Sequence, residues 1–376
     1  MEKNRQKKHS GGMILIMVMW ILTILSLFAV GLGYRSSIEL RLTSMYLSKL
    51  RATYLGQEAV YTVFFHIAND QDRNVDAYNE PWGNSPDLFF EADYEDAKVT
   101  VVHFTENNDR EKVELYGASD EMGKIDINTI PQEILESDYW KEEFAMDEEL
   151  ITVITHWRQD TKKDKDLDNW YKTTYGYKAR HAPLQIIEEM HFMKNFASTS
   201  SDKTKKRKKL YDILTCYGPG QVNMNTAPSE VLKALFVSQG PRTEFPRSDR
   251  DELVRLIIEY RNGDDGLPGT TDDQIFKDIN IETAIETRDA KKISMLNWLR
   301  TKKLISVTSD YFRINAVVSF PGRNLDKTIN AVVTRSKDYA IKQSEKDKKK
   351  SRTVTVTDRK LDEDIDVMQI LKYFED

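Results

Sequence analysis

Four aspartates recur at short intervals in the middle of the chain: Asp160, Asp164, Asp166 and Asp168. Carboxylate oxygens that gather on one side of a loop are ligands that calcium prefers. A calcium loop beginning at Asp164 would also need glycine at its sixth position and glutamate at its twelfth, where this chain has Asn169 and Tyr175. We therefore expect a solvated acidic loop. These aspartates are the only metal candidate in the sequence, with calcium as the possible ion, and no cofactor is certain.

Other side chains that commonly catalyse reactions form no recognisable catalytic pattern. The histidines lack the spacing of a metalloprotease: His9, His66, His103, His156, His181 and His191. There is no nucleophile elbow and no glycine-rich phosphate or dinucleotide motif. Cys216 is the only cysteine, so no disulfide can form within the chain. The sequence predicts a protein that is not an enzyme, and its net charge of −6 does not favour nucleic acid.

The elements that must position these residues begin with a long apolar segment. Residues 1–12 are polar and mostly basic and end in Gly11-Gly12, whereas residues 13–33 contain no charged side chain. About 20 apolar residues are enough to cross a bilayer as a helix. Apolar residues then recur at helical spacing, and no proline precedes Pro81. We expect one helix from about Met13 to about Ile67, with its first half in the membrane.

The basic residues before the apolar segment indicate its orientation. Positive flanks stay in the cytoplasm, which places the chain after Arg35 outside it. No small-residue cleavage site of a secretory signal follows Gly33. We expect a single-pass inner-membrane protein with a cytoplasmic N-terminus and a periplasmic body. A plain single-pass anchor is the alternative interpretation of the helix.

An internal repeat follows in the body of the chain. Residues 124–135 match residues 221–232, and each copy precedes an apolar helix that ends in an aromatic–arginine pair, Trp157-Arg158 or Tyr260-Arg261. Both copies contain residues that commonly start helices. The expected caps are Asn128, Thr129, Pro131, Asn225, Thr226 and Pro228, and Thr129 with Gln132 fits a capping box.

These units resemble helix-hairpin-helix (SAM-like) repeats of DNA-binding competence proteins. That mode of binding needs a glycine-rich hairpin, so that backbone amides can approach a phosphate. Residues 139–143 and 240–244 stand between the paired helices, and neither segment is a Gly-x-Gly turn. We expect the fold without the phosphate site and no nucleic-acid partner. A membrane-anchored nucleic-acid-binding protein of DNA uptake is the alternative function.

The Gly-Gly junction resembles the class III signal of type IV prepilins. The resemblance implies that a prepilin peptidase cuts between Gly12 and Met13. Most members of that family carry glutamate at the fifth mature position, where it pairs with the free amine of a neighbouring subunit. Here that position holds Met17, which cannot pair. Such a subunit suits the end of a filament better than its middle.

Together these features resemble the general secretion pathway protein K family, the large minor pseudopilin of type II secretion. The resemblance runs from about Lys8 to about Thr334. It includes Asp120-Glu121-x-Gly123-Lys124, Leu214-x-x-Tyr217-Gly218, Ile305-Ser306-Val307 and Ser309-x-Tyr311-Phe312. It implies a subunit at the pseudopilus tip that helps to start assembly. The implied partners are the I and J minor pseudopilins, the major pseudopilin and prepilin peptidase. A type IV pilus tip subunit is a further alternative.

The same resemblance bears on the metal. Members of the family can bind calcium in an inserted domain, near an Asp-Trp-x-Asp-x-Asp stretch. Residues 156–161 here read His-Trp-Arg-Gln-Asp-Thr, so two or three of the expected carboxylates are missing.

The remaining sequence predicts an α+β fold. Alternating side chains indicate strands at 97–104, 112–116, 311–320 and 327–334. We expect an antiparallel sheet packed on the long N-terminal transmembrane/pilin helix, with a large, mostly helical domain that carries both repeats inserted. The expected parts are a leader (1–12), a transmembrane helix (13–34), a pilin-like helix and first strands (35–120), the inserted domain (121–303), closing strands (304–340), and a linker with an acidic tail (341–376).

Charged segments complete the chain. The basic residues 203–209 are expected to form a flexible exposed loop, with a polyanion-binding patch as the alternative. Residues 342–352 are typical of a disordered linker, and residues 353–357 alternate like a strand. The acidic tail 361–376 could be a short docking segment, whose docking site the sequence does not identify.

Overall fold

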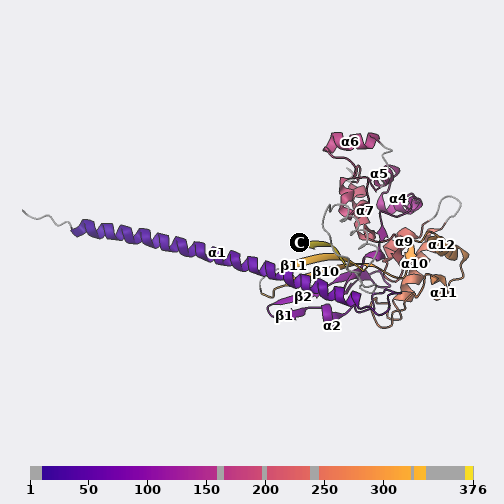
Figure 1. Cartoon of the computed structure of the whole chain (residues 1–376), viewed down its shortest axis with the longest axis horizontal. Helices are drawn as coiled ribbons and strands as arrows, with labels where there is room; N and C mark the ends of the chain where they lie inside the picture. Colours follow the sequence, from indigo (N-terminus) through magenta and orange to yellow (C-terminus); the bar gives the residue numbers. More distant parts are fainter. Residues whose placement is uncertain are drawn as a thin grey trace, which may run out of the picture. The chain divides into compact units, whose positions relative to one another are not determined.

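The computed structural model describes residues 11–158, 165–196, 201–237, 245–322, 326–335 and 369–375. Contacts between residues divide the chain into two units, Met1–Leu55 and Gly56–Asp376. Helix α1 (Gly11–Ala68) begins in the first unit and ends in the second (Figure 1). The predicted helix from Met13 to Ile67 is therefore confirmed.

In the first unit, α1 is long and apolar enough to cross a membrane. Its most apolar window has a mean hydropathy of 2.8, and none of that window is buried within the protein. Keeping so many apolar side chains in water is unfavourable, whereas a bilayer of hydrocarbon tails accepts them. Length and composition thus agree with a single membrane anchor.

In the second unit, the last turns of α1 use one face to pack against a sheet. This face consists of four buried apolar residues that are adjacent or three to four positions apart in the sequence: Ala59, Val60, Val63 and Ile67. A Cβ atom at Gly56 would lie only 2.7 Å from the Ile329 side chain. Glycine at this position therefore allows the helix and the strand to approach closely.

The sheet is antiparallel. Its strands follow the order β1 (Ala92–Tyr94), β2 (Ala97–Val101), β10 (Tyr311–Ser319), β11 (Asp326–Thr334) and β12 (Gln369–Glu375), and β5 (Ser119–Asp120) also pairs with β10. Side chains along β10 alternate between buried and half-buried positions, as in a strand with one face on the core. Helix α2 (Pro86–Phe89) precedes β1. The two late strands predicted from the sequence are confirmed.

The strand predicted at 97–104 is interrupted. β2 ends at Val101, and β3 (His103–Glu106) forms a separate hairpin with β4 (Lys112–Leu115). Between the two strands, Val102 donates its N–H to the backbone oxygen of Asn315 on β10 over 3.1 Å. The alternation of side chains continues through this bend, so the sequence pattern could not reveal it.

Part of the C-terminal tail joins the sheet. Strand β12 pairs along β11 from Thr334↔Gln369 to Ile329↔Glu375, with a shift of register between Val332 and Val333. This segment of the acidic tail therefore docks on the chain's own sheet edge. The predicted linker at 342–352 and the strand-like residues 353–357 lie outside the described residues.

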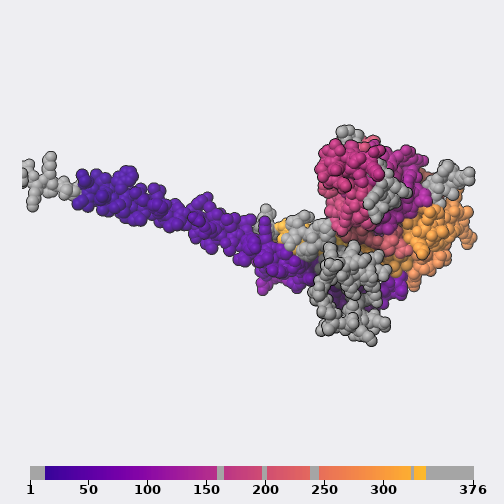
Figure 2. Space-filling view, turned by 45° about the horizontal axis from the view of Figure 1, so that its top comes forward, coloured from indigo at the N-terminus to yellow at the C-terminus, as the bar shows by residue number. Residues whose placement is uncertain are grey.

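Between β5 and β10 about half of the described residues lie in helices, and Figure 2 shows this part of the chain as a bulky mass coloured magenta to orange. The helices are α3 (Gln132–Leu135), α4 (Asp138–Phe144), α5 (Glu148–Arg158), α6 (Lys165–Tyr175), α7 (Ser201–Lys208), α8 (Leu210–Ile213), α9 (Ser229–Leu235), α10 (Arg247–Arg261), α11 (Ile281–Ala284) and α12 (Ala290–Thr301). Buried apolar residues from Ile125 to Val307 form one core cluster. Within it, Trp140 donates its Nε1–H to the backbone oxygen of Ala234 over 2.8 Å, which joins the two repeats.

The expectation of a flexible loop at residues 203–209 is wrong, because most of this segment belongs to α7. Arg207 is buried and donates to the backbone oxygens of Ala145, Asn195 and Phe196 and to the Asp147 carboxylate. A planar guanidinium can serve several acceptors that lie in different directions. Local charge patterning cannot distinguish this one buried arginine from the basic side chains beside it.

Candidate functional site

Each repeat opens with a two-residue strand in a parallel pair. In the first repeat β6 (Ile125–Asp126) pairs with β7 (Leu214–Thr215), and in the second β8 (Val222–Asn223) pairs with β9 (Ile305–Ser306). Both pairs bring a distant segment of the chain to the start of the repeat. The repeated sequence is thus matched by a repeated arrangement of the backbone.

The arginine that ends each repeat bonds back to the start of that repeat. Arg158 donates to the backbone oxygens of Ile127 and Ile130 over 2.5 and 3.1 Å. Arg261 donates to those of Met224 and Ala227 over 3.4 and 2.6 Å. These two pairs of carbonyls occupy equivalent positions in the aligned repeats. The aromatic–arginine pairs noticed in the sequence therefore close each repeat on itself.

An asparagine in each repeat holds the backbone of a residue far along the chain. Asn128 accepts from the N–H of Leu184 over 2.7 Å and donates to its carbonyl over 3.0 Å. Asn225 does the same with Phe276, over 2.8 and 3.1 Å. A carboxamide offers one donor and one acceptor side by side, so it can satisfy both backbone groups of a single residue.

The expected capping roles of Asn128, Thr129, Asn225 and Thr226 are therefore wrong, whereas Pro131 and Pro228 do stand at the helix N-termini. Helices α3 and α9 begin after Pro131 and Pro228, which are themselves the N-cap residues, and neither N-cap makes a side-chain hydrogen bond. Thr129 donates its hydroxyl to Asp126 over 3.0 Å instead of capping α3. Thr226 donates to Asp120 over 2.6 Å. Both threonines are of a type that commonly caps helices. Their hydroxyl groups instead bond to carboxylates that lie earlier in the chain, three residues away for Thr129 and 106 residues away for Thr226.

One position differs between the repeats in a way that the packing explains. Asp126 and Asn223 each accept a hydrogen bond from the backbone N–H two residues later, over 2.9 and 3.0 Å. Only Asn223 also donates, to the backbone oxygen of Asp76, to Asp120 and to Ser309, over 3.0, 2.8 and 2.9 Å. An ionised aspartate has no hydrogen to donate. The second repeat therefore needs an amide where the first has a carboxylate.

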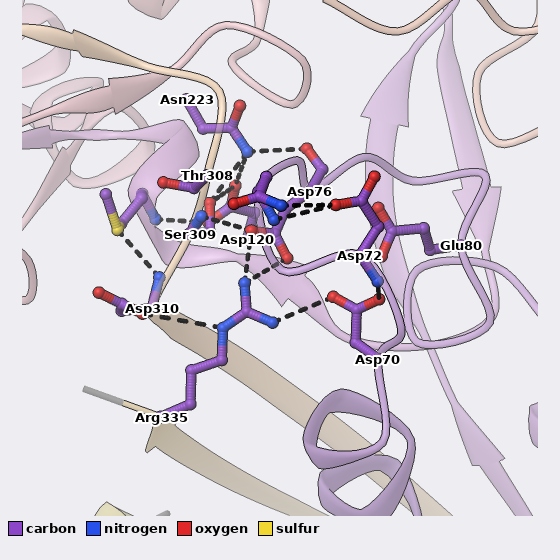
Figure 3. A network of polar contacts seen from close by, with 12 residues as sticks. Asp70, Asp72, Asp76, Glu80, Asp120, Asn223, Thr308, Ser309, Asp310 and Arg335 are labelled. Atoms are coloured by element: carbon purple, nitrogen blue, oxygen red, sulfur yellow. Dashed lines mark hydrogen bonds and ion pairs between the residues drawn. The ribbon is translucent and has the colours of Figure 1, made fainter. Parts of the chain in front are cut away.

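These contacts form a buried polar junction between the repeats and the sheet (Figure 3). Asp120 accepts from Asn223, from Thr226, from the hydroxyl of Ser309 and from the backbone N–H of Met122. Burial raises the pKa of Asp120, and these four hydrogen bonds act in the opposite direction. Asp120 and Ser309 belong to short motifs on which the family resemblance rests. Their observed role is to join segments inside the protein.

Arg335 completes the junction from the end of β11 (Figure 3). Its Nη2 lies 2.5 and 2.6 Å from the two carboxylate oxygens of Asp76, and its Nη1 lies 3.1 Å from Asp70. Asp76 also accepts the backbone N–H of Ser309 over 2.7 Å. Asp70, Asp76 and Glu80 lie close enough together to suggest a metal site, but the Arg335 guanidinium already supplies the positive charge there.

A second buried ion pair lies beside this junction. Glu121 accepts from the Nη2 and Nε of Arg313 over 2.6 and 3.0 Å, and from the Thr215 hydroxyl over 3.1 Å. Burial by itself would raise the pKa of Glu121. The positive charges of Lys124 and Arg313, together with these hydrogen bonds, outweigh burial and lower the pKa to about 2. Glu121 therefore stays ionised and ties β10 to the first repeat.

The predicted acidic metal loop is only partly described. Asp160 and Asp164 lie outside the described residues, whereas Asp166 and Asp168 lie on α6. Asp168 faces two histidines, His156 and His181. Calcium prefers six to eight oxygen ligands. In the described part of the site, the neighbours of Asp168 are two imidazole nitrogens, and calcium at the four aspartates stays a prediction from the sequence.

The residues of the predicted processing signal lie in the first unit. Gly12, Met13 and Met17 are all part of α1, and the Met17 side chain is exposed. Cleavage before Met13 and the consequence of an apolar fifth mature residue stay predictions from the sequence.

Comparison with known proteins finds a similar fold but no similar sequence. No protein-family model and no curated protein sequence matches it. A solved chain does match: it belongs to the crystal structure of the GspK-GspI-GspJ complex from the type 2 secretion system of enterotoxigenic Escherichia coli. The match has a TM-score of 0.55 and 12% identity, and covers 90% of this chain and 99% of that one.

This chain has the fold of that secretion-system protein. The likeness confirms the α+β fold, with a long N-terminal helix, an antiparallel sheet and a large helical content. At 12% identity the comparison speaks for the fold. The fold expected from the sequence resemblance therefore agrees with the fold found by the comparison.

Proposed function

We propose that this protein is a minor pseudopilin of a type II secretion system, similar to the general secretion pathway protein K family. The observation that carries this proposal is a fold shared with a chain of the GspK-GspI-GspJ complex over nearly the full length of both chains. The apolar segment of α1 supports it, since a pseudopilin is held in the inner membrane by such a helix. The Gly11-Gly12 junction, where prepilin peptidase would cut, gives independent support.

The mechanism that we propose is assembly. The apolar part of α1 would join a bundle with the equivalent helices of the major pseudopilin and of the I- and J-type minor pseudopilins. The neighbour in the fold comparison was solved with GspI and GspJ, which makes their counterparts the first partners to test. The body after Arg35 would then lie in the periplasm, with the N-terminus in the cytoplasm.

Two features favour a place at the tip of the pseudopilus and a role in starting it. Met17 stands where most pseudopilins carry a glutamate, so it cannot form a salt bridge to the amine of a neighbouring subunit. The helical residues between β5 and β10 also add bulk to the body (Figure 2). A subunit with that bulk would leave little room for another subunit above it.

N-terminal mass analysis of the protein from membranes tests the proposal. With prepilin peptidase present we expect a mature chain beginning at Met13, and without it a chain that still carries residues 1–12. Gly12→Leu should block the cut. Gly33→Leu is the matched control, because a side chain at Gly33 would meet no other atom within 4 Å. A chain that keeps residues 1–12 although peptidase is present would overturn the proposal.

The nucleic-acid alternative loses its structural basis in the first repeat. Residues 139–143, where a phosphate-binding hairpin would have to lie, belong to helix α4, and Trp140 is fully buried. The corresponding residues 240–244 of the second repeat lie outside the described residues. Deletion of the protein should abolish secretion and leave DNA uptake intact. The opposite result would favour a DNA-uptake protein, and loss of pilus function alone would favour a type IV pilus tip subunit.

A further inference from the structure

Three side chains from separate segments meet on the inserted helical part. His156 lies on α5, Asp168 on α6, and His181 in the loop after α6. The Nε2 of His181 lies 3.0 Å from both carboxylate oxygens of Asp168, and the Nε2 of His156 lies 3.2 Å from one of them. One nitrogen or oxygen of each residue lies within 4.8 Å of those of the other two.

The hydrogen bonds of His181 favour a positive charge between its ring and Asp168. Its Nδ1 lies 3.2 Å from the backbone oxygen of His156, and a carbonyl can only accept, so the Nδ1 carries the hydrogen. In a neutral imidazole the Nε2 is then a bare acceptor. It would face a carboxylate that also only accepts. With this tautomer a second proton or a metal ion would separate them, and a backbone carbonyl is one of the usual partners of the second ring nitrogen in a metal-bound histidine.

The spacing of the three side chains suits a small divalent ion. Tetrahedral zinc, with bonds of about 2.0–2.1 Å, separates its ligand atoms by roughly 3.3 Å. The nitrogen-to-oxygen distances of 3.0 and 3.2 Å are close to that value. The His156 side chain is 4% exposed, while those of His181 and Asp168 are 17% and 24% exposed. A cluster with this burial is shielded from bulk water yet open enough to admit an ion.

The surrounding structure holds in place the loop that carries His181. Ala182, next to His181, donates its N–H to the backbone oxygen of Trp157 over 3.1 Å. Asn128 holds the backbone of Leu184, which lies in the same loop. His181 itself has a φ of +50°, a left-handed conformation that is uncommon outside glycine. The loop therefore presents this histidine to Asp168 despite a backbone conformation that most residues avoid.

We propose that His156, Asp168 and His181 bind one divalent transition metal ion, with Zn²⁺ as the ion that fits best. Two imidazole nitrogens and one carboxylate are a donor set typical of zinc, and the fourth position would be taken by water. The resembled family implies calcium in this domain, which requires oxygen ligands. The metal would link α5, α6 and the loop after it, and so stabilise the inserted helical part.

Metal binding can be measured directly on the full chain in detergent. The protein is treated with a chelator, incubated with Zn²⁺, freed of excess metal and analysed by elemental mass spectrometry. We expect one equivalent of zinc and a rise in melting temperature, since an ion that binds only the folded state stabilises it. Co²⁺ in the same site should give the visible absorption bands of a tetrahedral complex.

Variants decide whether these three residues are the ligands. His181→Asn removes a ligand while keeping a residue type that accepts a left-handed backbone, and Asp168→Asn keeps the size of the side chain. His191→Gln is the matched control, because this exposed histidine lies in the same part of the chain outside the cluster. We expect zinc affinity to fall at least about 10-fold in either ligand variant and to stay unchanged in the control. Circular dichroism checks that each variant is folded.

Other results would contradict the proposed zinc site. No zinc bound to the unmodified chain, or full retention of zinc by both ligand variants, would show a hydrogen-bonded cluster without a metal. An equal loss in His191→Gln would place the metal elsewhere. Displacement of zinc by millimolar Ca²⁺ would overturn the proposed class of ion.

Discussion

The side-chain amide of Asn223 donates to the carboxylate of Asp120 over 2.8 Å, although 103 residues separate them in the sequence. Asn223 belongs to the second repeat and Asp120 to the short strand β5, which pairs with β10. The same amide also donates to the backbone oxygen of Asp76, which follows α1. A single side chain therefore joins the repeats, the sheet and the segment after the long helix.

We expect Asn223→Asp to destabilise the protein by about 3 kcal/mol. The change keeps the size of the side chain but removes its donor hydrogens and places a negative charge beside Asp120 and Asp76 in a buried site. Urea denaturation at neutral pH measures the loss.

Asp126→Asn, at the same position of the first repeat, is the matched control. Burial raises the pKa of Asp126 to about 6. Because the folded state holds this proton more tightly than the unfolded state does, stability falls as the pH rises from 3.8 to about 6, and the ionised carboxylate carries its full cost above pH 6. The control should therefore lose little or even gain at neutral pH. Equal losses in both variants would contradict the role assigned to Asn223.

The repeat-closing arginines should not tolerate lysine. We expect Arg261→Lys to lower the free energy of unfolding by about 2 kcal/mol. Both carbonyls accept from the terminal Nη1 of this buried side chain, which the shorter lysine would not reach, and a buried ammonium is costly to desolvate. Arg158→Lys should act in the same direction but less strongly, since Arg158 is only half-buried. Arg255→Lys on the exposed face of α10, where the side chain pairs with Glu259, should change stability little. An equal effect at Arg255 would argue against closure of the repeats by these side chains.

The ion pair of Glu121 and Arg313 should make stability depend on pH. The folded protein lowers the pKa of Glu121 from its ordinary value of 4.5 to about 2. The folded state therefore binds fewer protons, so this contribution is fully present above pH 4.5 and is lost as the pH falls towards 2. The difference in unfolding free energy between the unmodified protein and Glu121→Gln should be large at pH 7 and smaller at pH 3. Glu114→Gln changes an exposed glutamate and is the control. A difference that does not vary with pH would refute this assignment.

The apolar fifth mature residue offers a test of the proposed place at the tip. Met17→Glu would supply the carboxylate that most pseudopilins use to pair with a neighbouring subunit. We expect cleavage before Met13 to persist and cross-linking between copies of this chain in membranes to increase. Met19→Glu, two residues along the same exposed segment, is the control. If Met17→Glu cross-links no more than the unmodified protein, an apolar residue at this position does not determine the place in the filament.

Several elements were predictable because their signals are local. The absence of proline before Pro81 and the apolar run after Gly12 are sufficient to indicate α1. Strands β10 and β11 follow from alternating side chains on either side of Pro321-Gly322, a sequence typical of turns. The repeat was visible as a repeated pattern, and its closing arginines stood at matching positions. In each case neighbouring residues carry the information.

The partners of individual side chains were decided by the tertiary structure alone. Asn128 is of a residue type that commonly caps helices, yet its side chain is hydrogen-bonded to the backbone of Leu184, 56 residues away. His156, Asp168 and His181 meet only because α5, α6 and the following loop pack together. Strand β12 finds its place on β11 across a long intervening segment. The sequence by itself determined the long apolar helix, strands β10 and β11, and the repeats. Which polar groups are buried together depends on contacts between distant segments, which no local pattern of residues encodes.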